Sequence, residues 1–327
     1  MAKIVLGIAT AHTPLLTLDS DEWYNRSLAD RKNSRLSLAD GRLVDYDELV
    51  KLRGEPYAAD ATPENYARLA GICQAHLDTL AGALAKANVD VVVIVGDDQA
   101  ELYRPGNMPA IAVYYGDTIL THPMGEDLPD WMNQVARGYA MDKVHAFPGH
   151  AGLAMDIIHG LIDREVDLAI ADENPEGRGF GHAFGFPAER LFGGKDIPMI
   201  PVMLNTYFPP NVLSPSRCFS VGAKLREAIE ASPLDLRVAV LASGGLSHFV
   251  VEEELDRTVM GALGDPTGEA LSAIPREAML EGTSEILNWI LTAGSVTHLP
   301  LKWSAYEPIR RTPAGTGIGC GFAIWSE

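Results

Sequence analysis

The chain has 327 residues, of which 47% are hydrophobic and 21% are charged, and its formal net charge is −18. This composition supplies enough apolar material for a full core and excludes a disordered chain. So acidic a surface repels phosphate backbones and anionic lipids, and we therefore expect neither nucleic acid nor a membrane as a partner. An anionic substrate would need local basic side chains that reverse this field. The candidates are Arg190, Lys302, Arg310 and Arg311.

The cysteines and the N-terminal sequence bear on the compartment. Cys73, Cys218 and Cys320 are far apart and form no CxxC pair, which argues against a disulfide framework and a cysteine-based zinc site. Free thiols are typical of a reducing cytosol. The N-terminal sequence MAKIVLGIATAHTP is typical of a first β-strand and not of a signal peptide. No apolar run approaches the roughly 20 residues of a membrane span. We therefore expect a cytoplasmic protein.

The first third of the chain combines buried strands with one long insertion. Residues 3–9 form an apolar run typical of a buried strand. Residues 16–62 are polar and irregular, with one short helix expected near DYDELVKL. A helix start signal at Thr62-Pro63 opens a predicted helix over 63–87. The β-branched run VDVVVIVGDDQ at 89–99 indicates a central parallel strand that is covered on both faces.

Strand and helix patterns then alternate toward the C-terminus. Further buried strands are predicted at 110–115, 167–171, 198–204 and 236–243, and helices at 150–163, 217–231, 250–262 and 282–293. This alternation predicts a three-layer α/β/α fold with a mixed, mostly parallel central sheet, in a single domain over 1–327. We expect the 16–62 insertion to lie near the active-site mouth and to shape specificity.

Polar residues follow the apolar strands, where open α/β sheets bind their ligands. His12 follows the first strand, Asp97-Asp98-Gln99 the second, and His248 comes after the turn Gly244-Gly245. Glu285 is expected in the first turn of the 282–293 helix. Each residue alone has a structural explanation, such as a hydrogen-bonded histidine or a helix cap. Together they indicate a divalent iron or manganese site with a free histidine for proton transfer, since non-haem Fe(II) oxygenases use two histidines and one carboxylate.

The ordered set of these segments resembles the class III extradiol ring-cleaving dioxygenases. That family includes the catalytic beta subunit of protocatechuate 4,5-dioxygenase and the gallate and 3-O-methylgallate dioxygenases. The segments that carry the resemblance are GIATAHTP (7–14), VVIVGDDQAE (92–101), NMPAIAVY (107–114), FPGHAGLAMDII (147–158), GFGHAFGF (179–186), NTYFPP (205–210), ASGGLSHF (242–249) and TSEILNWILTAG (283–294). The segment DGRLVDYDELVKLRGE and the sequence GDDQ are most similar to the 3-O-methylgallate branch.

The resemblance implies a role for several residues. His12 and Glu285 match the iron ligands, His248 matches the catalytic acid and base, and His182 matches a second active-site histidine near the substrate. The residues expected to contact the substrate are Asp98, Tyr207 and Arg310.

The chain departs from the family at the second iron-binding histidine, which in many members directly follows Asn-Asp. Here that position is Gln99, after Asp97-Asp98, and we expect its amide oxygen to be the third ligand. The alternatives are Asp98, a loop histidine, a different or weaker metal, or loss of the metal. The loop histidines are His122, His145 and His150.

The resemblance implies an Fe(II)-dependent enzyme that opens the ring of a catecholic aromatic acid with O2. Substrates of the 3-O-methylgallate, gallate or protocatechuate type all fit. A metal-poor, non-catalytic binding protein of the same fold is one alternative, suggested by Gln99. A metal- or serine-dependent hydrolase is another, suggested by Ser247 beside His248, although GxSxG is absent. A homodimer is expected, and a small partner subunit stays open because some relatives have one.

Overall fold

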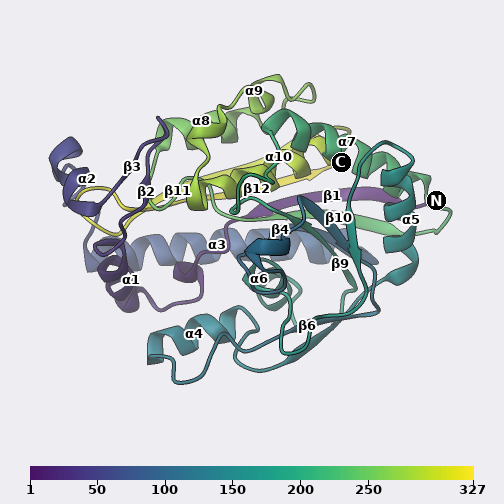
Figure 1. Cartoon of the computed structure of the whole chain (residues 1–327), viewed down its shortest axis with the longest axis horizontal. Helices are drawn as coiled ribbons and strands as arrows, with labels where there is room; N and C mark the ends of the chain where they lie inside the picture. Colours follow the sequence, from purple (N-terminus) through teal and green to yellow (C-terminus); the bar gives the residue numbers. More distant parts are fainter.

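A mixed eight-stranded sheet forms the centre of the molecule (Figure 1), and the computed structural model describes all residues 1–327. Its strand order is β11-β12-β1-β10-β4-β9-β5-β8. The strands are β1 (Lys3–Thr10), β4 (Val91–Asp97), β5 (Ile111–Tyr114), β8 (Ala169–Ala171), β9 (Met199–Leu204), β10 (Arg237–Ser243), β11 (Leu301–Arg310) and β12 (Gly317–Ser326). The central strands β1, β10, β4 and β9 are parallel, whereas β12 and β5 join antiparallel at the two sides. Every strand predicted from an apolar run is present.

Helices cover both faces of the sheet, which confirms the three-layer α/β/α prediction. One face packs against α3 (Pro63–Ala87) and α6 (His182–Leu191), with α4 (Asp130–Gly138) farther out (Figure 1). The other face carries α5 (Ala151–Ile162), α7 (Pro215–Ala231), α8 (Glu253–Ala262), α9 (Glu269–Ser272) and α10 (Ile286–Ser295). The buried apolar side chains accordingly form one large cluster on each side of the sheet, and their removal from water stabilises the fold. No helix is both long enough and apolar enough to cross a bilayer.

The helix α3 begins and ends where local chemistry dictates. The Thr62 hydroxyl accepts a hydrogen bond from the backbone N–H of Asn65 at 3.3 Å, and Pro63 occupies the first turn. The helix ends at Asn88, whose φ of 47° lies in the left-handed region that asparagine tolerates better than most residues. The predicted helix over 63–87 is confirmed at both ends.

Several elements were not predicted from the sequence. They are the strand β11, the helices α1 (Trp23–Asp30), α4 and α6, and the two-stranded pairs β2 (Leu36–Ser37) with β3 (Leu43–Val44) and β6 (Thr118–Thr121) with β7 (His145–Pro148). The helix α6 contains Pro187 and is almost wholly buried, so it shows no amphipathic period. The predicted helix over 282–293 begins later, because residues 281–285 form a tighter 3-10 turn. Glu285 therefore directly precedes α10 instead of lying inside its first turn.

The 16–62 insertion is anchored to the body of the protein by a buried ion pair. It contains the predicted short helix, α2 (Tyr46–Arg53), as well as α1. Asp30, at the end of α1, accepts hydrogen bonds from Arg311 Nε at 2.7 Å and Arg311 Nη2 at 3.0 Å, and both side chains are buried. The Thr316 hydroxyl donates to the same carboxylate at 2.9 Å. Because Arg311 and Thr316 flank the turn between β11 and β12, this contact ties the insertion to the C-terminal hairpin.

We expect Asp30→Asn to destabilise the protein strongly. The substitution leaves the buried Arg311 guanidinium without its counter-charge, and breaking a buried pair from one side costs about 3–5 kcal/mol. The urea midpoint of unfolding measures the effect. Asp40→Asn is the matched control, because Asp40 pairs with Arg42 at the exposed surface, and no measurable shift is expected there. Equal midpoints for the two variants would contradict the anchoring role of Asp30.

Candidate active site

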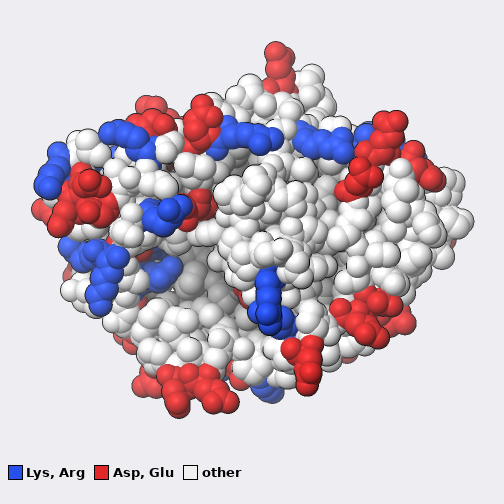
Figure 2. All heavy atoms as spheres, viewed as in Figure 1, with Lys and Arg blue, Asp and Glu red and all other residues white.

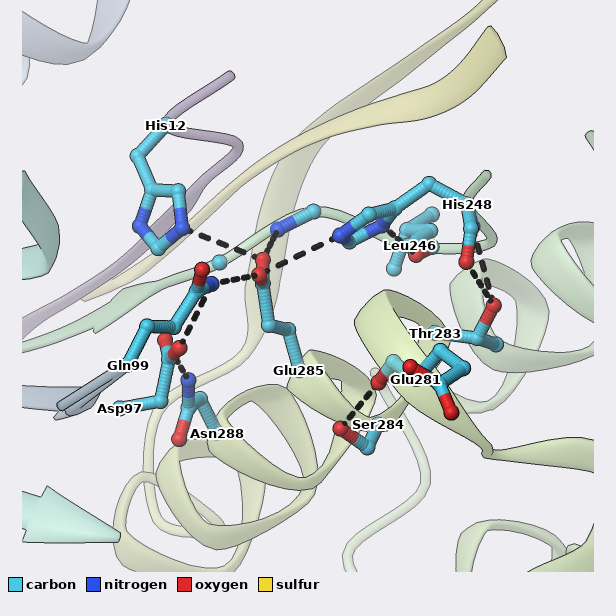
Figure 3. Close-up of polar contacts among 12 residues, drawn as sticks. His12, Asp97, Gln99, Leu246, His248, Glu281, Thr283, Ser284, Glu285 and Asn288 are labelled. Atoms are coloured by element: carbon cyan, nitrogen blue, oxygen red, sulfur yellow. Dashed lines mark hydrogen bonds and ion pairs between the residues drawn. The ribbon is translucent and has the colours of Figure 1, made fainter. Parts of the chain in front are cut away.

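The candidate site lies at the carboxyl ends of the parallel strands β1, β4 and β10 (Figure 3). His12 follows β1, Asp97 ends β4, and His248 lies in the loop after β10. Glu285 enters from the residue before α10. These four side chains are all buried, and segments far apart in the sequence bring them together. The strand-end argument from the sequence therefore located them in one place.

The carboxylate of Glu285 is the centre of the polar contacts in Figure 3. Its Oε2 accepts a hydrogen bond from the Gly245 backbone N–H at 2.6 Å and lies 3.2 Å from His12 Nε2. Its Oε1 accepts from Gln99 Nε2 at 3.1 Å and lies 3.2 Å from His248 Nε2. Burial raises the pKa of Glu285, but His12 and His248 outweigh it and hold that pKa well below its usual range. Glu285 is therefore an anion inside the protein.

Three buried side chains form a group that can hold a divalent metal. His12, Asp97 and Glu285 each present a ligand atom, and these atoms lie within 4.8 Å of one another. His12 Nδ1 lies 3.0 Å from the Ser243 hydroxyl, whereas the buried His12 Nε2 makes no hydrogen bond. His12 Nε2 faces the Glu285 carboxylate at 3.2 Å without hydrogen-bond geometry, which suits an imidazole that ligates a metal through Nε2 and is held through Nδ1.

Asp97 reinforces this assignment through its charge. Burial and the nearby charge of Glu285 both raise the pKa of Asp97, because two carboxylates in one buried space repel each other. The Asp97 carboxylate accepts hydrogen bonds from Asn288 Nδ2 at 3.3 Å and Gln99 Nε2 at 3.2 Å, both neutral donors. A divalent cation would offset the two negative charges directly. From the sequence, Asp97 was interpreted only as a turn or helix cap.

Gln99, the third ligand expected from the sequence, occupies a different role in the structure. Its amide nitrogen donates to Asp97 and to Glu285, so it bridges the two carboxylates. Asp97 is therefore a second candidate for the third ligand, beside Gln99. The three loop histidines considered as replacements do not belong to the group. His150 caps α5, for example, and His145 pairs with Asp142 at 2.7 Å.

The loop after β10 holds His248 in one orientation. His248 Nδ1 donates to the Leu246 carbonyl at 2.8 Å, which leaves Nε2 facing Glu285. The neighbouring Gly282 permits this approach, because a Cβ at that position would lie 2.0 Å from the His248 ring. The Ser247 hydroxyl instead donates to Asp256 at 2.6 Å. Ser247 and His248 therefore do not form the nucleophile and base of a hydrolase.

His182 forms a second buried histidine–carboxylate pair beside the metal group. Its Nδ1 lies 2.5 Å from Glu101 Oε1, and its ring lies edge-on to His12 with 4.5 Å between ring centres. Burial lowers the pKa of His182, but the charge of Glu101 outweighs it and raises that pKa to about 9. The same pairing lowers the pKa of Glu101 to about 2. Glu101 was missed from the sequence, although it stands only two residues after Gln99.

A cavity of about 310 Å³ opens above these residues and is lined by the three histidines, Gln99 and Glu285. Its volume lies at the small end of the range for small-molecule sites, about 300–1,000 Å³. Trp131, Met132 and Val135 of α4 supply an apolar wall, and Arg26 and Arg311 supply positive charge. Figure 2 shows a hollow in this face between α1 and α6, with Lys and Arg side chains on the α1 side.

Only one of the three expected substrate contacts lines this cavity, and it is Tyr207. Asp98 lies outside, because its carboxylate accepts backbone hydrogen bonds from Glu101, Leu102 and Tyr103 at 2.6–3.1 Å. Arg310 also lies outside the cavity and pairs with Asp60 at 3.0 Å and with Glu253. The carboxylate and guanidinium of these two residues are thus already engaged within the protein. The neighbouring Arg311 reaches the cavity instead.

Comparison with known proteins agrees with this geometry. The family model described as "Catalytic LigB subunit of aromatic ring-opening dioxygenase" matches residues 59–295. A gallate dioxygenase of Pseudomonas putida is 29% identical over 184 residues, which cover 52% of this chain and 52% of that protein. A 2,3-dihydroxyphenylpropionate/2,3-dihydroxicinnamic acid 1,2-dioxygenase of Mycolicibacterium paratuberculosis is 34% identical over 120 residues, covering 34% and 36% of the two chains. The chain thus spans about half, or less, of the curated relatives it matches. The expected family is confirmed.

We expect Asp97→Asn to weaken metal binding by at least about 10–100-fold, because it removes one of the two anionic ligands. Gln99→Ala should retain one metal per chain, since its amide supports the carboxylates without contacting the ion. Anaerobic Fe(II) titration against a competing chelator, and Mn(II) binding followed by electron paramagnetic resonance, measure both variants without relying on turnover. Loss of the metal in Gln99→Ala but not in Asp97→Asn would restore Gln99 as the ligand.

Proposed function

Because this chain belongs to the family of catalytic LigB subunits of aromatic ring-opening dioxygenases, we propose that it is an extradiol dioxygenase acting on a catecholic aromatic acid. The proposed substrates are acids of the 3-O-methylgallate, gallate or protocatechuate type, with O2 as the second substrate. The observation that carries the proposal is the buried His12–Asp97–Glu285 group with His248 Nε2 3.2 Å from Glu285. His12, Glu285 and His248 line one cavity, which supports a metal and a proton-transfer group that act on the same ligand.

We propose Fe(II) as the resident metal, held by His12, Asp97 and Glu285. One imidazole and two carboxylates form a nitrogen and oxygen donor set that suits Fe(II) and Mn(II), whereas sulfur donors are absent from the group. When bound, the metal would acidify the catechol hydroxyls and bring the ring and O2 together. The ligand set therefore differs from the two histidines and one carboxylate common in non-haem Fe(II) oxygenases.

His248 is proposed as the acid and base. Since its Nδ1 donates to the Leu246 carbonyl, Nε2 is the nitrogen free to accept a phenolic proton and to return it later. Burial lowers the pKa of His248, but the nearby Glu285 raises it further, so Nε2 holds a proton well once it has received one. The Gly282 backbone keeps the ring in this orientation.

His182 is proposed to stabilise negative charge on the substrate. Paired with Glu101, it is an imidazolium at neutral pH, and it lines the cavity. A fixed cationic donor of this kind stabilises an anion most where water is excluded. Trp131, Met132 and Val135 supply that exclusion as an apolar wall.

Two alternatives have less support. A binding protein without metal needs neither a buried His12 that faces a carboxylate nor two adjacent buried carboxylates, so the donor group supports an enzyme. A serine hydrolase needs a free hydroxyl beside its base, whereas Ser247 donates to Asp256. We further propose a cytoplasmic homodimer. The cytoplasmic assignment is supported by three buried cysteines that form no disulfide.

The decisive test is oxygen uptake by anaerobically purified, Fe(II)-loaded protein with a panel of catecholic acids. The wild-type protein should consume one O2 per ring opened, and chelation should abolish uptake. His248→Asn should lower kcat about 10²–10⁴-fold while metal content and substrate affinity stay unchanged, because it removes only the proton-transfer group. His145→Asn is the matched control, since His145 pairs with Asp142 away from the cavity. Stoichiometric iron without uptake on any catechol, or full activity in His248→Asn, would contradict the proposal.

A further inference from the structure

The guanidinium of Arg26 lines the cavity without an ionic partner. Arg26 lies on α1 within the 16–62 insertion, and its buried Nε makes no hydrogen bond. Other arginines near this face are paired, Arg311 with Asp30 and Arg53 with Glu252. Arg26 is partly buried, and holding a cation there without a counter-charge is unfavourable, so its unpaired guanidinium indicates a place for an anion.

The charges around Arg26 also indicate that an anion is missing beside it. Burial and the positive charge of Arg311 lower the pKa of Arg26, and the nearby Asp30 offsets this only in part. Asp30 is itself committed to Arg311 through two hydrogen bonds. Nothing in the protein therefore neutralises Arg26 at short range.

A count of the charged groups around the cavity shows which ligand charge would balance them. Glu101 neutralises His182, and a divalent metal would neutralise Asp97 together with Glu285. Asp30 neutralises Arg311. The cavity then retains one positive charge, that of Arg26, in a protein whose net charge is −18. A monoanionic ligand matches this remainder, although the overall field repels anions.

The position of Arg26 suits a substituent of a bound aromatic ring. Its Cζ lies 6.0 Å from the centre of the Phe249 ring, and Phe249 follows the proposed acid and base, His248. Tyr207 lines the same cavity. Arg26 thus lines the same cavity as the candidate metal ligands without belonging to their group, and its fork of N–H donors matches the geometry of a carboxylate.

We propose that Arg26 binds the carboxylate of the aromatic substrate, so that the 16–62 insertion selects catecholic acids over neutral catechols. This inference rests on the proposed ring-cleaving function. Arg26 takes the place of Arg310 as the expected basic substrate contact, because the Arg310 guanidinium is engaged by Asp60 and Glu253.

Matched acids and amides test the proposal, because the amide preserves the shape of the carboxyl group and removes its charge. The probes are 3,4-dihydroxybenzoate and gallate, each paired with its carboxamide. The wild-type protein should prefer the acids, and Arg26→Gln should lower kcat/KM for the acids about 10–100-fold. The values for the amides should change less than about twofold. Arg31→Gln, directly after the same helix, is the control, because it removes the same formal charge at an exposed position.

Binding without turnover separates this inference from the function on which it rests. Quenching of tryptophan fluorescence, with Trp131 in the cavity wall, reports binding of the acids and amides to Zn(II)-loaded protein under anaerobic conditions, where no turnover occurs. Arg26→Gln should weaken binding of the acids alone. Equal affinity of the wild-type protein for acid and amide, or equal losses for both in the variant, would overturn the role of Arg26. Failure of the wild-type protein to consume O2 would instead overturn the dioxygenase assignment.

The stability of the variant excludes a purely structural role. Because Arg26 makes no ion pair and its Nε no hydrogen bond within the protein, Arg26→Gln should leave the urea midpoint unchanged or raise it. A clear loss of stability together with equal losses for acid and amide would mean that Arg26 only supports the fold.

Discussion

The carboxylate of Glu285, at the start of α10, is buried, and three other segments of the chain contact it: His12 after β1, Gln99 after β4 and the loop after β10. A buried carboxylate is costly unless its oxygens are satisfied, so these contacts also fix where the segments lie relative to one another. Each parallel strand delivers its polar residue to the same edge of the sheet. The site is therefore a consequence of how the fold accommodates one internal negative charge.

Around this centre, charges are organised as pairs between distant segments. Glu101 fixes His182 as a cation next to His12, and Asp30 fixes Arg311 at the turn of the C-terminal hairpin. The second pair also brings α1 to the cavity mouth, which is how the insertion contributes Arg26. An acidic protein can therefore place an unpaired positive charge, that of Arg26, in a cavity, because local pairing decides the field that a bound ligand experiences.

Local pairing also explains the arrangement of Asp97 and Gln99 at the end of β4. Asp97, two residues before Gln99, brings a second carboxylate within 4.8 Å of the ligand atoms of His12 and Glu285. Gln99 then serves both carboxylates through its amide nitrogen. The proposed ligand set of two carboxylates and one imidazole would leave a divalent ion formally neutral, which would favour its retention in a buried site.

The sequence by itself determined the central sheet, most of its covering helices and the positions of His12, His248 and Glu285. These follow from local rules, because buried parallel strands need continuous apolar runs and ligands bind at their carboxyl ends. The short or fully buried elements, such as α6 and β11, escaped prediction because they carry no clear hydrophobic period.

Only the tertiary structure decided which polar groups remain free. Asp98 and Arg310 match the residue types expected of substrate contacts. However, the Asp98 carboxylate already accepts hydrogen bonds from backbone N–H groups, and the Arg310 guanidinium is already paired with carboxylates. Asp97 and Arg26 look ordinary in the sequence. In the fold, Asp97 lies beside another carboxylate, and Arg26 has no anionic partner. Whether a charge is available depends on partners that are distant in the chain, and sequence spacing alone does not contain that information.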